Sequence, residues 1–438
     1  MTLTAGESNP NKWSLLQKIF FRFFFVYFML NISPWSWLDN TVPGINYVTE
    51  YYDKAISWIT ELFNRLWFHF EKTNIVNNGS GDTSENWEMI YTFFILAVAG
   101  TLLWSILDRK RKSYIRANYW LLTFTRYYVI INCFIYGIIK LYCLQMIFPN
   151  QSQLATPLGD LLPMRFAWMF IGYSSPYQMF SGAMEVLAGV LLLNRRTITL
   201  GLFIATAVFV NVMVLNLSYD IPVKLFSIHL VLFCLYLMLN DSKRLVDFFI
   251  FNRAGTANTL HQLSFPKKWM RVTRIILKLA FIALFVVKPL IETRDRHRSF
   301  YAENNTKPIA PGIYDVTVFA VNKDTIPPLV TDTLRWRDLI FEKGGLGSVG
   351  STDTAFRQRY RRGYFSFIPD TAQQTIVFKK TAAATSLLYK FHYAFPDSNT
   401  IQLRGSRNKD SVFVVLKKSM RHFQLAEKQF HWISEANR

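Results

Sequence analysis

Residues 177–216 read YQMFSGAMEVLAGVLLLNRRTITLGLFIATAVFVNVMVLN, and this stretch decides the class of fold. Two apolar runs, 177–194 and 197–216, are separated by the basic pair Arg195-Arg196. Each run is close to the roughly 20 residues that a helix needs to cross a bilayer. Glu185 is the single acidic residue in the stretch. The pattern predicts two membrane-spanning helices joined by a short basic loop.

Five further stretches share this apolar character, so the sequence predicts seven spans in all. No small-residue cleavage site follows the first stretch, which is therefore expected to stay in the protein as a helix. The predicted spans are 14–32, 88–107, 119–147, 177–194, 197–216, 222–240 and 271–289.

The composition supports a protein that is partly membrane and partly polar. Of the 438 residues, 51% are hydrophobic and 16% aromatic, whereas 18% are charged, against roughly 25% in soluble proteins. A soluble protein could not bury so many apolar residues. The mean hydropathy of +0.15 is too low for a chain embedded throughout. Both a purely soluble enzyme and a purely embedded bundle are excluded.

The charge and the cysteine count exclude several other classes. The net charge of +20 could suggest nucleic acid, but membrane proteins reach the same sign through cytoplasmic Lys and Arg, so we expect no nucleic-acid partner. Three cysteines without CxxC spacing argue against disulfides, an Fe–S cluster or zinc, and we expect no metal site. His229 is the one histidine within a predicted span, which excludes a bis-histidine haem.

Loop charges predict the orientation. Basic residues fill the loops after the second, fourth and sixth predicted spans, and acidic residues fill the loops on the opposite side. By the positive-inside rule the N-terminus is cytoplasmic. Seven spans then place the chain end outside. We expect a multi-pass protein of the bacterial inner membrane with its C-terminal part in the periplasm.

The predicted domains are a helical part, 1–290, and a polar part, 291–438. In the second part, short β-branched runs alternate with turn signals such as Gly344-Gly345 and Pro369-Asp370, which predicts a mostly antiparallel β domain. A small barrel or a sandwich would fit, with at best a loose likeness to lipocalins. The predicted strands are 314–321, 334–342, 363–368, 375–379, 387–393, 400–403 and 411–417.

Residues 42–70 predict an amphipathic helix outside the membrane. Apolar residues recur at spacings of three and four from Ile45 to Trp67, with charges between them. The helix could lie in the outer interface or pack on the β domain.

Polar residues within the predicted spans are candidates for a functional site, because such residues cost free energy in a membrane. At 1.5 Å per residue, one layer of the outer leaflet would hold Lys140, Glu185, Asn211 and His229. Gln145, Asp220 and Lys224 would lie above it near Pro222. The layer could be a polar clasp that holds the helices together, or a pocket that opens outward. In the pocket reading these residues bind a ligand.

Arg22 and Arg126 form a second predicted layer, toward the cytoplasm. We expect them to reach anionic headgroups at the membrane surface. The alternative is that Arg126 contributes to ligand binding.

Several of these residues also carry a resemblance to DoxX-like membrane proteins over about residues 15–255. The matching segments are Arg126-Tyr127-Tyr128 with Gly137-x-x-Lys140 and Gln145; Gly182-x-x-Glu185-x-x-x-Gly189; Asn211, Asn216 and Asp220-x-Pro222-Val223-Lys224; and Gly79-Ser80-Gly81-Asp82-Thr83. The β domain departs from the four-helix DoxX pattern. The resemblance implies a pocket for a quinone-like or lipid molecule, quinone being the one cofactor it suggests. In layout the chain is more remotely similar to vitamin K-dependent carboxylases, which would make Lys140 or Lys224 a base.

Two functional hypotheses follow. In the first, the protein binds a quinone or lipid as a component of a membrane oxidoreductase, and Lys140 and Glu185 are the catalytic candidates. In the second, it is a non-enzymatic accessory or assembly subunit of an envelope complex, in contact with membrane lipids and with other envelope proteins. The β domain carries 23 Lys and Arg against 14 Asp and Glu, which suits an acidic partner.

Overall fold

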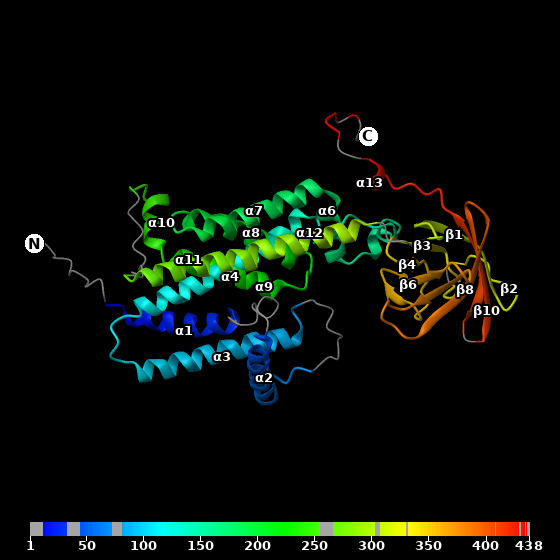
Figure 1. Cartoon of the computed structure of the whole chain (residues 1–438). Coiled ribbons are helices and arrows are strands. Elements are labelled where there is room, and N and C mark those ends of the chain that lie inside the picture. Colours follow the sequence, from blue (N-terminus) through cyan, green and yellow to red (C-terminus); the bar gives the residue numbers. More distant parts are fainter. Residues whose placement is uncertain are drawn as a thin grey trace, which may run out of the picture. The chain divides into compact units, whose positions relative to one another are not determined.

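The chain folds into two compact units in the computed structural model (Figure 1). The structure describes residues 12–32, 44–71, 81–254, 266–302, 307–329, 332–407, 409–428, 431–433 and 435. The helical unit comprises Met1–Met146 and Ser175–His297, and the β unit comprises Ile147–Ser174 and Arg298–Arg438. The division predicted at residue 290 thus has its counterpart at residue 297. Ile147–Ser174, assigned to the helical part from sequence, folds with the β unit.

The helices of the helical unit follow the predicted apolar stretches within a few residues. They are α1 (Leu15–Ile32), α2 (Asn46–Phe63), η2 (Asn64–Phe68), α3 (Ser84–Leu107), α4 (Ile115–Leu141), α7 (Ser175–Leu193), α8 (Ile198–Ser218), α9 (Lys224–Leu239), α10 (Ser242–Phe249), α11 (Lys268–Ile282), η4 (Ala283–Val287) and α12 (Lys288–Tyr301), the last of which continues into the β unit.

Five of these helices are long and apolar enough to cross a membrane, which indicates a membrane protein: α1, α3, α4, α7 and α8. The sixth predicted span is α9, which has 16 residues and bends by 80° into α10, so the pair could form one broken span. The seventh predicted span, 271–289, covers most of α11, all of η4 and the first two residues of α12. Helix α11 has 15 residues and includes Lys268, Arg271, Arg274 and Lys278, so it is both shorter and more charged than the five candidate spans.

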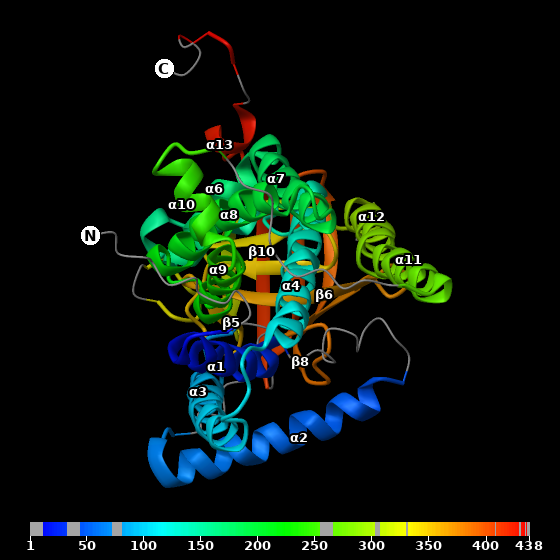
Figure 2. The same cartoon turned by 90° about the vertical axis from the view of Figure 1, so that its left-hand side faces the viewer.

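The long helices run side by side around an aromatic core, whereas α2 lies across them, end-on in Figure 1 and lengthwise in Figure 2. On α2 the side chains of Thr49 and Thr60 are buried, and Tyr52 donates a hydrogen bond to the Leu30 carbonyl of α1 at 3.4 Å. The larger apolar side chains Trp58 and Trp67 are exposed. An exposed aromatic face on a crosswise helix is the arrangement expected at a membrane interface.

The β unit is an antiparallel barrel. Its strands are β1 (Gly312–Val321), β2 (Asp324–Thr325), β3 (Asp338–Phe341), β4 (Leu346–Val349), β5 (Arg357–Arg359), β6 (Arg362–Asp370), β7 (Thr375–Lys379), β8 (Leu387–Asp397), β9 (Thr400–Arg407) and β10 (Asp410–Lys418). Eight strands follow the order β10–β9–β8–β7–β6–β4–β3–β1, and β1 pairs with β10 to close the barrel. The short β2 and β5 pair with β1 and β6.

The predicted strands correspond to β1, β3, β6, β7, β8, β9 and β10, and β4 was missed. The turn signal Gly344-Gly345 was recognised, but the four residues after it pair back onto β3 as a hairpin. Both glycines have positive φ, of 83° and 71°, as the turn requires. The β4 segment was not predicted as a strand because Gly347 has a low β propensity and only one of its four residues is β-branched.

Aromatic side chains fill the barrel. Trp336, Phe341, Phe378 and Phe391 have no exposed surface, and the rings of Phe365 and Phe378 stack with centroids 4.2 Å apart. A filled interior of this kind is a packed core, in contrast to the ligand cavity of a lipocalin. The likeness to lipocalins is therefore limited to strand count and closure.

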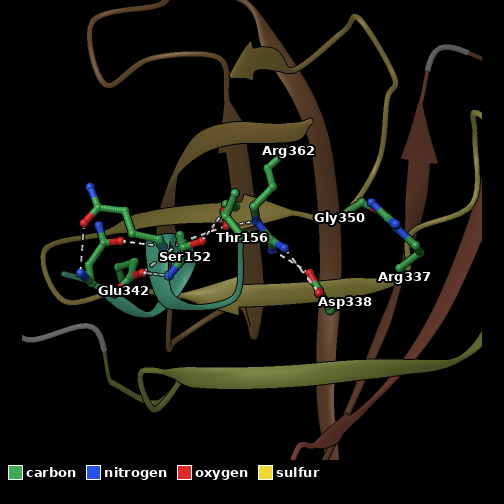
Figure 3. A network of polar contacts seen from close by, with 10 residues as sticks. Ser152, Thr156, Arg337, Asp338, Glu342, Gly350 and Arg362 are labelled. Carbon is green, nitrogen blue, oxygen red and sulfur yellow. Dashed lines mark hydrogen bonds and ion pairs between the residues drawn. The ribbon is translucent and has the colours of Figure 1, made fainter. Parts of the chain in front are cut away.

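Ile147–Ser174 packs on the outer face of the barrel and includes three short helices: α5 (Gln151–Leu154), η3 (Leu158–Asp160) and α6 (Pro163–Tyr173). Ser152 donates from its backbone N–H and its hydroxyl to Glu342 Oε1, at 2.7 and 2.8 Å. Ser348 Oγ donates to Ser152 Oγ at 2.8 Å, and Arg362 Nε donates to Ser348 Oγ at 3.0 Å (Figure 3). This chain from cation to carboxylate ties the segment to β4 and β6.

Candidate functional site

The helical unit contains a cavity of about 210 Å³. Its walls are mostly apolar, and a few polar side chains reach it. The apolar lining includes Met89, Ile90, Leu225, Phe226 and Phe233, and the polar lining includes Asn31, Asp82, Asn86, Tyr128 and His229. Apolar walls with a few polar groups are typical of small-molecule sites.

His229 is the one predicted site residue that lines this cavity. Its Nδ1 lies 2.6 Å from the Leu225 carbonyl, and its Nε2 lies 2.8 Å from the Tyr27 hydroxyl. A carbonyl only accepts, so Nδ1 carries the proton, and Nε2 of the neutral ring accepts from Tyr27. The two contacts fix the orientation of the ring and the tautomer of its neutral form.

Asp82 fixes the start of α9 beside the cavity. Its two carboxylate oxygens accept the backbone N–H groups of Lys224 and Leu225, at 2.6 and 2.9 Å. This capping role of Asp82 was not predicted, because Asp82 lies in a turn-rich segment whose composition indicates only a connecting loop. A signal was nevertheless present: α9 begins at Lys224 after Val223, which has no capping side chain, so its first N–H groups need an acceptor from elsewhere.

Lys140 and Glu185, predicted to lie at one depth, form a buried ion pair. Lys140 Nζ lies 2.5 Å from Glu185 Oε1, and the two side chains are 7% and 1% exposed. The Lys140 ammonium also lies 5.8 Å from the ring centroid of Tyr136. Neither residue lines the cavity around His229.

The pair lies where α4 and α7 approach closely. A Cβ on Gly182 would lie 2.7 Å from the Gly137 carbonyl oxygen and 2.8 Å from Lys140 Cβ, so only glycine fits there. Small residues at a crossing of this kind allow two membrane helices to pack closely. Glu185 Oε2 is buried and has no hydrogen-bond partner among the described residues. The contacts are those of a clasp between two helices, with one carboxylate oxygen left over.

The other predicted residues do not line the cavity. Asn211 is exposed on α8. Asp220 is 83% exposed and pairs with Lys224 at 2.7 Å. Gln145 lies after the end of α4 with its Oε1 buried and without a partner among the described residues. The predicted layer therefore separates into the Lys140–Glu185 clasp, the exposed Asn211 and the cavity residue His229. Asp220 and Lys224, predicted to lie above that layer, form an ion pair with each other.

The prediction that Arg22 reaches the membrane surface is wrong. Its side chain is buried, and it donates to the Tyr114 hydroxyl at 2.7 Å and to Ser105 Oγ at 2.8 Å. These partners satisfy the hydrogen-bonding groups of the guanidinium within the protein. The Tyr114 hydroxyl in turn donates to Asp108 at 3.0 Å, which links Arg22 to a carboxylate. Arg126 is half-buried, and its guanidinium lies 5.4 Å from the ring centroid of Tyr127. It does not line the cavity.

Within the described part of the chain, no group of three or more His, Cys, Asp or Glu side chains could hold a metal ion. The residues placed to hold an organic ligand are those around His229. Tyr27, Asp82 and Tyr128 were not predicted. A single tyrosine in an aromatic span carries no signal of its own until the fold brings it to a histidine on another helix.

Comparison with known proteins gives one informative relative. No family model matches the chain, and no solved structure matches it. The uncharacterized protein YwoB of Bacillus subtilis (strain 168) is 35% identical over 126 residues, which make up 28% of this chain and 79% of YwoB. On this similarity the chain belongs to the same family as YwoB.

Proposed function

We propose that the protein is a membrane protein that binds a quinone-like or lipid molecule in the cavity around His229. The observation that carries this proposal is the cavity itself: about 210 Å³, with apolar walls and a histidine held in one orientation by the Leu225 carbonyl and the Tyr27 hydroxyl. A ring or acyl chain would contact Met89, Ile90 and Phe226. The polar headgroup would face His229 and Asn31. The resemblance to DoxX-like proteins supports the same ligand class.

The Tyr27–His229 pair gives the site a proton route. When the imidazole is neutral, the Tyr27 hydroxyl donates to Nε2. A ligand oxygen that accepts from Tyr27 instead would free Nε2 to take up a proton. The pair can then exchange a proton with an ionised hydroxyl on the ligand: Nε2 of His229 gives its proton to that oxygen, and the imidazole returns to its neutral form.

In this proposal Lys140 and Glu185 have a different role from the catalytic one predicted from sequence. Their ion pair holds α4 against α7 and stays away from the ligand. Breaking this ion pair would lower the stability of the helical unit and would leave the affinity of the folded protein for the ligand unchanged. Function and stability can thus be separated by mutation.

The proposed orientation rests on connectivity and loop charge. Ile147–Ser174, which connects α4 to α7, belongs to the same unit as the barrel, so both lie on one side of a membrane. The basic segments Asp108–Lys112 and Arg195-Arg196 follow α3 and α7 and fall on the other side. By the positive-inside rule that side is cytoplasmic, and the barrel is outside, in the periplasm of a cell with two membranes.

A cavity-filling variant tests the proposal. The purified full-length protein in detergent would be titrated with decyl-ubiquinone, and bound lipids would be identified by native mass spectrometry. Ile90→Trp fills the cavity and should lower the affinity, or the retained ligand, at least tenfold. Leu102→Trp on the same helix is the matched control, because Leu102 is 62% exposed. Equal binding by both folded variants would refute the cavity as the site.

The second candidate, an accessory subunit of an envelope complex, is favoured by the basic β unit. Pull-down of the tagged full-length protein from native membranes tests it. A stoichiometric protein partner that Ile90→Trp also retains would favour this function over ligand binding.

A further inference from the structure

The β unit has a cavity of its own, of about 280 Å³, on the outer side of the barrel. It lies between Ile147–Ser174, strands β4 to β6 and the segment after β7. Four cationic side chains line it: Arg165, Arg357, Arg359 and Lys380. This cavity is independent of the proposed ligand site in the helical unit.

None of these four cations has a carboxylate partner among the residues that the structure describes. The neighbouring arginines differ: Arg361 pairs with Asp160 at 3.1 Å, and Arg362 pairs with Asp338 at 2.5 Å. The one carboxylate lining the cavity, Glu342, accepts two hydrogen bonds from Ser152. The cavity therefore carries excess positive charge, whereas the arginines next to it in sequence are paired with carboxylates.

Two arginines are held in place by an aromatic ring. The Arg359 guanidinium carbon lies 4.8 Å from the ring centroid of Tyr360, and that of Arg165 lies 5.9 Å from it. Arg165 Nε also donates to the Tyr360 hydroxyl at 3.2 Å. Stacking of this kind orients a guanidinium before a ligand arrives, which lowers the entropy lost on binding.

The wall of the cavity also holds a polar group without a partner. Ser366 is 5% exposed and lines the cavity, and its Oγ is buried without a hydrogen-bond partner among the described residues. A buried hydroxyl of this kind is costly unless a ligand or water completes it. Tyr364 lines the cavity as well, and burial raises the pKa of its hydroxyl, which keeps it available as a donor at neutral pH.

We propose that this cavity binds the phosphate group of a small molecule or of a phospholipid headgroup. Three guanidinium groups and one ammonium suit a phosphate group, with its several acceptor oxygens, better than a single carboxylate. Arg357 and Arg359 contact the phosphate oxygens, and Ser366 donates to one of them. The volume is large enough for a glycerol phosphate. Tyr360 and Leu346 contact the non-phosphate part.

Binding by the full-length protein in detergent tests this site. Glycerol 3-phosphate is the soluble probe, and dihexanoyl-phosphatidylglycerol, below its micelle concentration, is the lipid probe. We expect measurable binding of at least one probe, weakened about 10- to 100-fold by Arg359→Gln, as for loss of a hydrogen bond to a charged group. Ser366→Ala should weaken it about threefold to tenfold, the loss of one neutral donor.

Arg361→Gln is the matched control, since it removes the same charge from the adjacent position outside the cavity lining. It should change affinity less than twofold. Tighter binding of glycerol 3-phosphate supports a soluble ligand, and tighter binding of the lipid supports a headgroup. The proposal is overturned by no binding of either probe. It is equally overturned by an equal loss in Arg361→Gln and Arg359→Gln, which would indicate general charge attraction only.

Discussion

Each unit buries an ion pair of 2.5 Å, Lys140–Glu185 in the helical unit and Arg362–Asp338 in the β unit, and the surroundings of the two pairs differ. In the barrel, Arg362 binds both oxygens of Asp338 and also donates to Ser348. In the helical unit, Glu185 Oε2 has no partner among the described residues. One pair is a member of a hydrogen-bond network, and the other is an isolated contact between two helices.

The difference reflects how the two units supply hydrogen bonds. Strands β3, β4 and β6 bring Asp338, Ser348 and Arg362 within hydrogen-bonding distance on the outer face of the barrel, and Ser152 of Ile147–Ser174 extends this network. Helices α4 and α7 approach so closely at Gly137 and Gly182 that no further side chain can enter. Close packing alone can therefore hold an incompletely satisfied charge in place.

The largest effect is expected from opening the helix crossing. Gly182→Leu places atoms where the Gly137 carbonyl and Lys140 Cβ already lie, so α4 and α7 must separate and the ion pair must break. We expect a loss of more than about 3 kcal/mol of unfolding free energy, or no folded protein. Gly159→Leu is the control, because a Cβ at Gly159 meets no atom within 4 Å. Thermal unfolding in detergent measures both; similar melting temperatures would contradict the close crossing.

The next largest effect is the loss of unfolding free energy when either buried ion pair, Lys140–Glu185 or Arg362–Asp338, is replaced. Glu185→Leu leaves the Lys140 ammonium buried alone and should cost about 3–5 kcal/mol, whereas Lys140→Met with Glu185→Leu should recover most of this loss. Asp338→Leu with Arg362→Met should stay destabilised by about 1–3 kcal/mol, because Ser348 loses its donor. Double-mutant cycles by denaturant unfolding test this. Equal recovery in both units would show that the network around Asp338 adds nothing.

The smallest effect is expected in the pH dependence of the stability of the barrel. Burial raises the pKa of Tyr389, with the neighbouring Arg407 partly opposing this. The folded state therefore keeps a proton that the unfolded chain loses above about pH 10, so stability is complete below that pH and falls as pH rises. Tyr389→Phe should reduce this fall by at most about 1.4 kcal/mol per pH unit. Hydrogen exchange of the β8 and β9 amides between pH 8 and pH 11 measures it; an unchanged slope would argue against the contribution of Tyr389.

Helices and strands could be predicted from the sequence where a segment has one clear hydrophobic pattern. The apolar runs predicted α1, α3, α4, α7 and α8 to within a few residues, because an 18-residue apolar run has few alternatives. Strand β4 was not predictable, since Gly347 and Ser348 carry no β propensity and gain their place from pairing with β3 and β6. The assignment of Ile147–Ser174 to the β unit also required the fold, as its partner Glu342 is 190 residues away from Ser152.

The sequence alone predicted apolar helices followed by β structure after residue 290, because hydrophobic periodicity is a local property. It also predicted that Lys140 and Glu185 lie at one level, since that level follows from counting residues along each helix, and the two side chains do form an ion pair. Only the tertiary structure decided which side chains share a cavity, because rotation about a helix axis and the closure of a barrel depend on packing. That is why His229 meets Tyr27 and Asn211 is exposed. It is also why four cationic side chains that have no carboxylate partner among the described residues line one cavity with Ser366.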